Sequence, residues 1–199
     1  MNSDFFIGKR SIEAEMHAKR EGFDKIVFIK EISSPNDAIK DRNRDAILIK
    51  TESADAMRRM IDKTYNFCKT ILVLGTDDKI SRIALENRKV SGLVSPEHER
   101  KNDYMDRRNS GLNQVLCKIA RDNKKEIIID FRSILSKEKE ERAILLGRIA
   151  QNIALCRKYG VRIRIANFAS SIGEMRSSGE LRSLCAAIGM STAQIRDAL

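Results

Sequence analysis

Short, dense apolar runs alternate along this chain with longer stretches of helical periodicity, and this alternation constrains the fold more than any other feature. Two runs, residues 71–74 and 127–129, contain only aliphatic side chains, as expected for strands that are covered on both faces. Together with five further runs they make seven candidate strands; the other five are residues 4–7, 25–29, 46–49, 92–94 and 161–166.

Amphipathic helices are predicted between these runs. A stripe of apolar residues at i, i+3, i+4, i+7 and i+8 predicts a helix over residues 112–121; its members are Leu112, Val115, Leu116, Ile119 and Ala120. Ser53 is a suitable N-cap for a helix that continues to about residue 67. Capping-box patterns at residues 177–180 and 191–194 predict two further helices, and the first of these should end at Gly189.

A longer helix is predicted over residues 137–158. The same periodic logic gives it a buried face made of Leu146, Ile149, Ala150, Ile153 and Cys156.

Strands that alternate with helices indicate a parallel sheet with right-handed crossovers. Both an open doubly wound sheet and a closed barrel fit this pattern. No glycine-rich phosphate loop follows an early strand, which favours the barrel, and 199 residues are few for eight strand–helix units. We therefore predict an α/β fold, a small distorted TIM-like (β/α) barrel of about seven parallel strands, with residues 1–199 as a single domain.

The last candidate strand, residues 161–166, alternates strictly between apolar residues and arginines. If the helices cover its apolar face, Arg162 and Arg164 point into the barrel and reach one of its mouths. The alternative is an edge strand whose arginine face is solvated.

The chain carries 38 Lys and Arg against 28 Asp and Glu, a net charge of +10, which favours a polyanionic partner. Several of these cations follow strands, so a parallel barrel would bring them to its C-terminal side; they are Lys30, Lys50, Arg107, Arg108, Arg132 and Arg176. A ring of cations suits binding of a phosphate backbone better than catalysis.

Few residues here suggest catalysis. His17 lies in a predicted helix and His98 in the charged loop 97–101, and neither has metal-ligand spacing. Asp130 ends a strand and could serve as a base or ligand, but pairing with Arg132 or Arg164 is the favoured interpretation. We therefore expect no catalytic or metal-binding residues.

The four cysteines are widely separated and are expected to be reduced, buried thiols of an intracellular protein; they are Cys68, Cys117, Cys156 and Cys185. No apolar run is long enough to cross a bilayer, and the first residues lack the apolar core of a signal peptide. A cytoplasmic location is expected.

Two stretches resemble a known family. Residues 106–120 (DRRNSGLNQVLCKIA) resemble the central signature of archaeal ribonuclease P protein component 3, the counterpart of the eukaryotic thirty-kilodalton ribonuclease P subunit. Residues 165–170 (IANFAS), 174–177 (EMRS) and 181–190 are similar to the family's last strand, its Arg-Ser segment and its closing helix. The resemblance covers essentially the whole chain.

This resemblance implies a distorted barrel related to metal-dependent phosphoesterases but without their histidine-rich site. It also implies a subunit that supports the catalytic RNA as ribonuclease P removes the 5′ leader from precursor tRNA. The implied partners are that RNA, protein component 2 and other subunits, and magnesium is needed by the holoenzyme but not as a cofactor of this chain. The candidate RNA-binding residues are Lys30, Lys50, Arg107, Arg108, Arg132, Arg164 and Arg176.

Two other functions remain open from the residues alone. The first is a free-standing barrel phosphoesterase, or an enzyme of a phosphorylated metabolite, although the isolated histidines and the missing phosphate loop weaken both. The second is a general RNA chaperone, which would need more aromatic side chains for base stacking than three Tyr and seven Phe.

Overall fold

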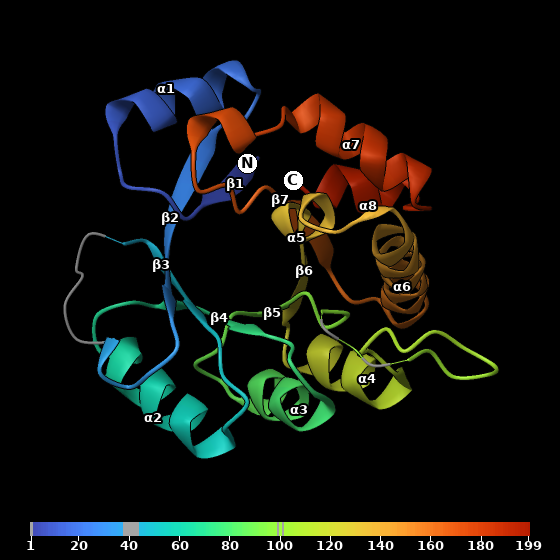
Figure 1. Ribbon diagram of the computed structural model, residues 1–199. Coiled ribbons are helices and arrows are strands. Elements are labelled where there is room, and N and C mark those ends of the chain that lie inside the picture. Colours follow the sequence, from blue (N-terminus) through green and yellow to red (C-terminus); the bar gives the residue numbers. More distant parts are fainter. Residues whose placement is uncertain (1, 38–43, 99, 101) are drawn as a thin grey trace.

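The computed structural model describes residues 2–37, 44–98, 100 and 102–199. Seven parallel strands form one sheet in chain order, and the sheet curves into a nearly closed barrel (Figure 1). The strands are β1 Ser3–Phe6, β2 Lys25–Ile32, β3 Ala46–Ile49, β4 Thr70–Leu74, β5 Gly92–Val94, β6 Glu126–Asp130 and β7 Ile163–Ala166. The predicted fold class and all seven predicted strands are confirmed.

The seam between β1 and β7 closes the barrel just beyond the end of β7. There, Phe6 forms a parallel bridge with Ala169, and the backbone N–H of Ile7 donates to the carbonyl of Ala169 at 2.8 Å. The barrel is therefore sealed at this level by a segment outside the regular strands.

Helices form a ring around the strands (Figure 1). They are α1 Ile12–Arg20, α2 Ala54–Tyr65, α3 Asp78–Glu86, α4 Gln114–Asp122, α5 Phe131–Leu135, α6 Lys139–Tyr159, the 3₁₀ helix η2 Ile172–Glu174, α7 Ser178–Ala187 and α8 Thr192–Asp197. The predicted N-cap Ser53 and both predicted capping boxes are present, and Gly189 takes the left-handed conformation (φ 96°) just after α7.

Side chains alternate along the strands between two apolar layers. One set fills the barrel interior, for example Ile29, Leu48 and Ile128. The other set packs between the strands and the helices, for example Phe28, Ile47 and Ile163. This double burial explains the unbroken aliphatic runs in the sequence.

The predicted helical faces need correction. Val115 on α4 is exposed, and the helix begins only after Asn113, which caps it. On α6 the fully buried positions include Leu145, Arg148 and Asn152, whereas Leu146 and Ala150 are only half-buried. The predicted positions Ile149, Ile153 and Cys156 are buried, so the prediction is confirmed there. It missed that the inward face also includes the polar residues Arg148 and Asn152.

All four cysteines are buried and free, as expected. None of the helices in the described part of the chain is both long and apolar enough to span a bilayer.

Candidate nucleic-acid interface

The strands β2, β3 and β6 direct charged side chains to the end of the barrel where the strands finish. We call this end the C-terminal mouth and define it by Glu31, Lys50, Asp130 and Arg132. Glu31 accepts from Lys50 Nζ at 2.6 Å and from Arg132 Nη2 at 2.8 Å. Burial opposes ionisation of Glu31, but these two cations prevail and lower its pKa. Two of the predicted cations thus converge on one carboxylate.

Asp130 has a structural task at this mouth. Its side chain accepts from the backbone N–H of Ser133 and caps α5, and its Oδ2 lies 3.9 Å from Arg132 Nη2. Burial raises the pKa of Asp130 to about 6, although Arg132, Ser133 and Lys50 oppose the shift. The expected pairing of Asp130 with Arg132 is confirmed.

Asp4 lies in the seam between β1 and β7, where sequence reasoning did not place a functional group. It accepts from the backbone N–H of Asn167 at 2.7 Å and from its Nδ2 at 2.8 Å. Asn167 also holds the backbone of Arg176, donating to its carbonyl and accepting from its N–H, both at 2.9 Å. Burial raises the pKa of Asp4 to about 6. The seam therefore fixes the start of the segment that carries Arg176.

Glu97 is a second acid that the sequence did not reveal, because it lies within the charged run 97–101. Its side chain is buried and accepts from Asn152 Nδ2 of α6 at 3.0 Å. Burial raises its pKa to about 7. The neighbouring His98 lies in a turn and donates its backbone N–H to the carbonyl of Ser95 at 2.9 Å.

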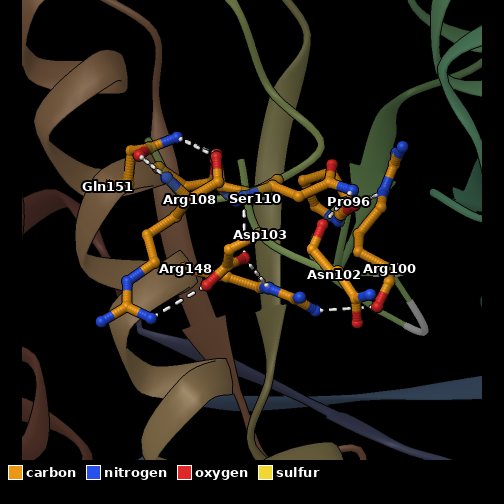
Figure 2. Close-up of polar contacts among 10 residues, drawn as sticks. Pro96, Arg100, Asn102, Asp103, Arg108, Ser110, Arg148 and Gln151 are labelled. Atoms are coloured by element: carbon orange, nitrogen blue, oxygen red, sulfur yellow. Dashed lines mark hydrogen bonds and ion pairs between the residues drawn. The ribbon is translucent and has the colours of Figure 1, made fainter. Parts of the chain in front are cut away.

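The loop between β5 and α4 carries Arg107 and Arg108 and projects beyond α4 and α6 (Figure 1). Asp103 organises this β5–α4 loop (residues 95–113), as Figure 2 shows. It accepts from Arg148 Nε at 2.8 Å, from Arg108 Nη1 at 2.9 Å and from the backbone N–H of Asn109 at 2.9 Å. Partial desolvation raises the pKa of Asp103, but these donors outweigh it and lower the pKa to about 2.

Helix α6 fixes the same loop from the side (Figure 2). Gln151 accepts from the backbone N–H of Arg108 at 3.0 Å and donates to its carbonyl at 2.9 Å. Gln151 also donates to the hydroxyl of Ser110 at 2.8 Å, and Asn152 donates to the carbonyl of Ser110 at 2.9 Å. These contacts fix Arg108 and Ser110 of the loop against α6, although the loop projects from the barrel.

The Ser-Gly-Leu-Asn part of the signature has a direct structural explanation. Gly111 has φ 77°, and a Cβ there would lie 1.8 Å from the carbonyl oxygen of Pro96, so no other residue fits. Leu112 is buried, and Asn113 caps α4 by accepting from the N–H of Leu116 at 3.0 Å. The signature thus builds the turn that leads into α4.

The tip of the loop presents Arg107 to solvent. Its side chain is 61% exposed, lies over the ring of Tyr104 at 4.6 Å and pairs with Asp106 at 2.9 Å. Arg108 is half exposed beside Gly147 of α6. A loop that is anchored by hydrogen bonds and displays two adjacent arginines and an aromatic ring is suited to contact phosphates.

The remaining predicted cations lie elsewhere. Lys30 is half-buried on the face of β2 opposite Glu31, and Arg176 donates from Nη1 to the carbonyls of Gly173 and Met175, each at 3.3 Å. Arg164 points into the barrel as expected, but it lies near the opposite end, where it donates to Ser3. The seven cations therefore occupy several regions, and their contact with RNA stays a prediction.

Comparisons with known proteins agree over most of the chain. A family model described as RNase P subunit p30 matches residues 16–199. Ribonuclease P protein component 3 of Methanocaldococcus jannaschii is 30% identical over 152 residues, which are 76% of this chain and 62% of that protein. The component 3 protein of Methanosarcina acetivorans is 31% identical over 148 residues, 74% of this chain and 59% of that protein. The chain thus spans about three fifths of the length of these relatives.

Solved structures give the same picture. A chain of the cryo-EM structure of archaeal ribonuclease P with mature tRNA matches with a TM-score of 0.80 and 25% identity, covering 98% of this chain and 85% of that one. The crystal structure of an amidohydrolase matches with a TM-score of 0.60 at 9% identity, covering 98% of this chain and 60% of that one, and shares the fold alone.

Proposed function

Because the chain belongs to the RNase P subunit p30 family, we propose that it is a protein subunit of ribonuclease P. In this proposal it supports the catalytic RNA while the holoenzyme removes the 5′ leader from precursor tRNA. The observation that carries the proposal is the β5–α4 loop, in which the family signature builds a rigid platform for Arg107 and Arg108. The likeness to a chain of archaeal ribonuclease P supports it further.

The proposed partners are the ribonuclease P RNA, protein component 2 and the other protein subunits, with precursor tRNA as the substrate of the assembly. We expect residues 1–199 to act as one domain in the cytoplasm. Magnesium is proposed to serve the RNA-based holoenzyme, and the chain is proposed to need no cofactor of its own.

The chain is proposed to have no catalytic role by itself, and the use of its acids supports this. Glu31 is engaged by Lys50 and Arg132, and Asp130 caps a helix. Asp4 accepts two hydrogen bonds from Asn167. These three carboxylates thus already have protein donors, which supports a structural task for them over activation of a water.

Reconstitution tests the proposal. Cleavage of precursor tRNA is measured with the RNA and the partner proteins, with and without this chain, over a range of magnesium concentrations. Omission should lower the rate or raise the magnesium requirement, and Asp130→Asn should change stability or assembly more than the chemical step. The purified chain with magnesium or manganese should cleave neither precursor tRNA nor simple phosphate esters. Cleavage by the chain alone that Asp130→Asn abolishes, with the fold intact, would establish an independent phosphoesterase instead.

A further inference from the structure

The end of the barrel where the strands begin contains an open cavity of about 440 Å³. We call this end the N-terminal mouth and define it by Lys25, Asp45, Lys124, Lys125, Glu126 and Arg164, which line the cavity. Interior apolar side chains such as Val27 and Leu72 form its floor. Its size falls within the range of about 300–1,000 Å³ that is usual for ligand sites.

Positive charge exceeds negative charge at this mouth. Four cations line the cavity against two carboxylates, Asp45 and Glu126. Both carboxylates already have cationic partners outside the cavity: Asp45 pairs with Arg10 at 2.6 Å, and Glu126 with Arg162 at 2.7 Å. The excess of positive charge facing the cavity is therefore larger than the simple count.

Two of the four cations are buried with incomplete compensation. Lys125 is 7% exposed, its Nζ donates to the carbonyl of Val90, and no carboxylate among the described residues lies within ion-pair distance. Arg164 is 8% exposed, lies over the ring of Phe5 and is 3.8 Å from Glu126, while its Nε has no hydrogen-bond acceptor in the described part of the chain. Burial of a cation without a matching anion, as at Lys125, is costly, and an anion in the cavity would offset that cost.

The other two cations are positioned to reach a ligand. Lys25 is the first residue of β2, and Lys124 precedes β6 in a left-handed conformation (φ 53°). Both are exposed, and neither forms an ion pair with a described residue.

We propose that the N-terminal mouth binds a phosphate group of an RNA strand. Lys25 and Lys124 contact the phosphate, and Lys125 and Arg164 supply fixed positive charge behind it. A phosphate oxyanion suits lysines, which act on it as mobile point charges. The choice of RNA as the carrier of the phosphate rests on the proposed function. This site lies at the opposite end of the barrel from the C-terminal mouth. RNA bound here would therefore contact a different face of the chain from RNA bound at the C-terminal mouth.

The test measures binding of the full chain to fluorescently labelled ribonuclease P RNA at several salt concentrations. The double variant Lys25→Ala/Lys124→Asn removes the two exposed cations, and Asn tolerates the left-handed backbone at position 124. The matched control, Lys79→Ala/Lys118→Ala, removes two exposed cations from the outer helices α3 and α4. The slope of log K against log salt should become shallower by about 0.7–0.9 in the double variant, as for one lost phosphate contact, and stay unchanged in the control.

A double variant that behaves like the control, or a wild-type chain that does not bind the RNA, would overturn the inference. A competition arm uses uridine 5′-monophosphate to separate the two sources of phosphate. If the mononucleotide binds as tightly as the RNA and depends on the same lysines, the mouth takes a small phosphorylated molecule and the RNA assignment is wrong. The reconstitution test keeps the two proposals apart: a holoenzyme at full activity without this chain defeats the proposed function, whereas an unchanged slope defeats only this site.

Discussion

The two mouths of the barrel use charge in different ways. At the C-terminal mouth, Lys50 and Arg132 share Glu31, and Arg132 also lies beside Asp130. Two cations are thus matched by two carboxylates. At the N-terminal mouth, four cations face two carboxylates that are themselves paired outside the cavity. The end of the barrel that usually carries function is internally balanced, and the opposite end is not.

This difference shows that a cation's position in the topology does not by itself make it available to a ligand. Lys50 follows a strand, as a phosphate-binding residue of a barrel would, yet its ammonium is 2.6 Å from a carboxylate. Lys25 begins a strand, where a barrel is expected to carry stability, yet it has no ion pair among the described residues. Whether a cation is available to a ligand depends on the acids around it. Four sets of substitutions test the roles of these acids and cations.

The largest effect is a loss of stability, and it is expected where the β5–α4 loop is held by the ion pairs of Asp103. Asp103→Ala removes a carboxylate from the buried guanidinium of Arg148 and from Arg108. Losing one partner of a buried pair costs about 3–5 kcal/mol, and since Asp103 is partly exposed we expect about 2–3 kcal/mol. Urea unfolding measures this loss. Asp106→Ala, which breaks only the exposed pair with Arg107, should change stability by less than about 0.5 kcal/mol. Equal effects of the two variants would contradict the role of Asp103.

The next effect concerns the buried acid beside the C-terminal mouth. Burial raises the pKa of Glu97 from 4.5 to about 7, so between these values the folded state binds more protons than the unfolded state. The contribution of Glu97 to the free energy of unfolding is therefore largest below pH 4.5, declines as pH rises, and is lost above about pH 7. Glu97→Gln should stabilise the protein at pH 8 by about 2 kcal/mol and flatten this decline, because an amide stays neutral.

Thermal and urea unfolding from pH 4.5 to 8 would measure this difference. The lowered pKa of Asp103 gives stability that is lost only as pH falls below about 4. Asp103 therefore titrates outside the measured range of pH 4.5 to 8. Glu52→Gln, an exposed acid, serves as control and should leave the profile unchanged. A Glu97→Gln profile parallel to that of the unchanged protein would show that Glu97 is ionised throughout.

A smaller effect should follow from unbalancing the C-terminal mouth so that it becomes like the N-terminal one. Glu31→Gln removes the shared partner of Lys50 and Arg132. If this mouth faces RNA, binding should tighten and the salt slope should become steeper by up to about one unit. Glu86→Gln, which releases Arg82 on the outer face of α3, is the matched control. No difference between the two variants would mean that the C-terminal mouth does not approach RNA.

Much of the fold could be predicted because strands buried on both faces leave a strong local signal. Runs such as residues 71–74 and 127–129 allow little else than interior strands. The signal failed where tertiary contacts replaced apolar burial. Arg148 and Asn152 occupy the inward face of α6 because they bind the β5–α4 loop, and α5 exists because Asp130 caps it directly after β6. The short helix α3 was not predicted at all.

The candidate site was predictable only in part. Strand-end position correctly brought Lys50 and Arg132 together, but Glu31 lies about a hundred residues from Arg132 in sequence, so their pairing left no local pattern. Asp4 meets Asn167 across an even longer separation. The N-terminal mouth was not predicted for a different reason: functional residues of a barrel are expected after strands, whereas Lys25 begins its strand and Lys124 precedes its strand.

The smallest expected effect compares two adjacent arginines of the β5–α4 loop, which have the same charge but different support. Arg107→Ala removes an exposed guanidinium whose partners in the described part of the chain are Asp106 and Tyr104, so stability should change by less than about 0.5 kcal/mol. Arg108→Ala removes a donor to Asp103 and should lower the free energy of unfolding by about 1 kcal/mol more than Arg107→Ala does. Both should reduce the salt slope of RNA binding by a similar amount, about 0.7–0.9 for one phosphate contact. Since the charge lost is equal, a slope change seen only with Arg108→Ala would mean that this variant acts through the shape of the loop, and Arg107 would then not be a phosphate contact.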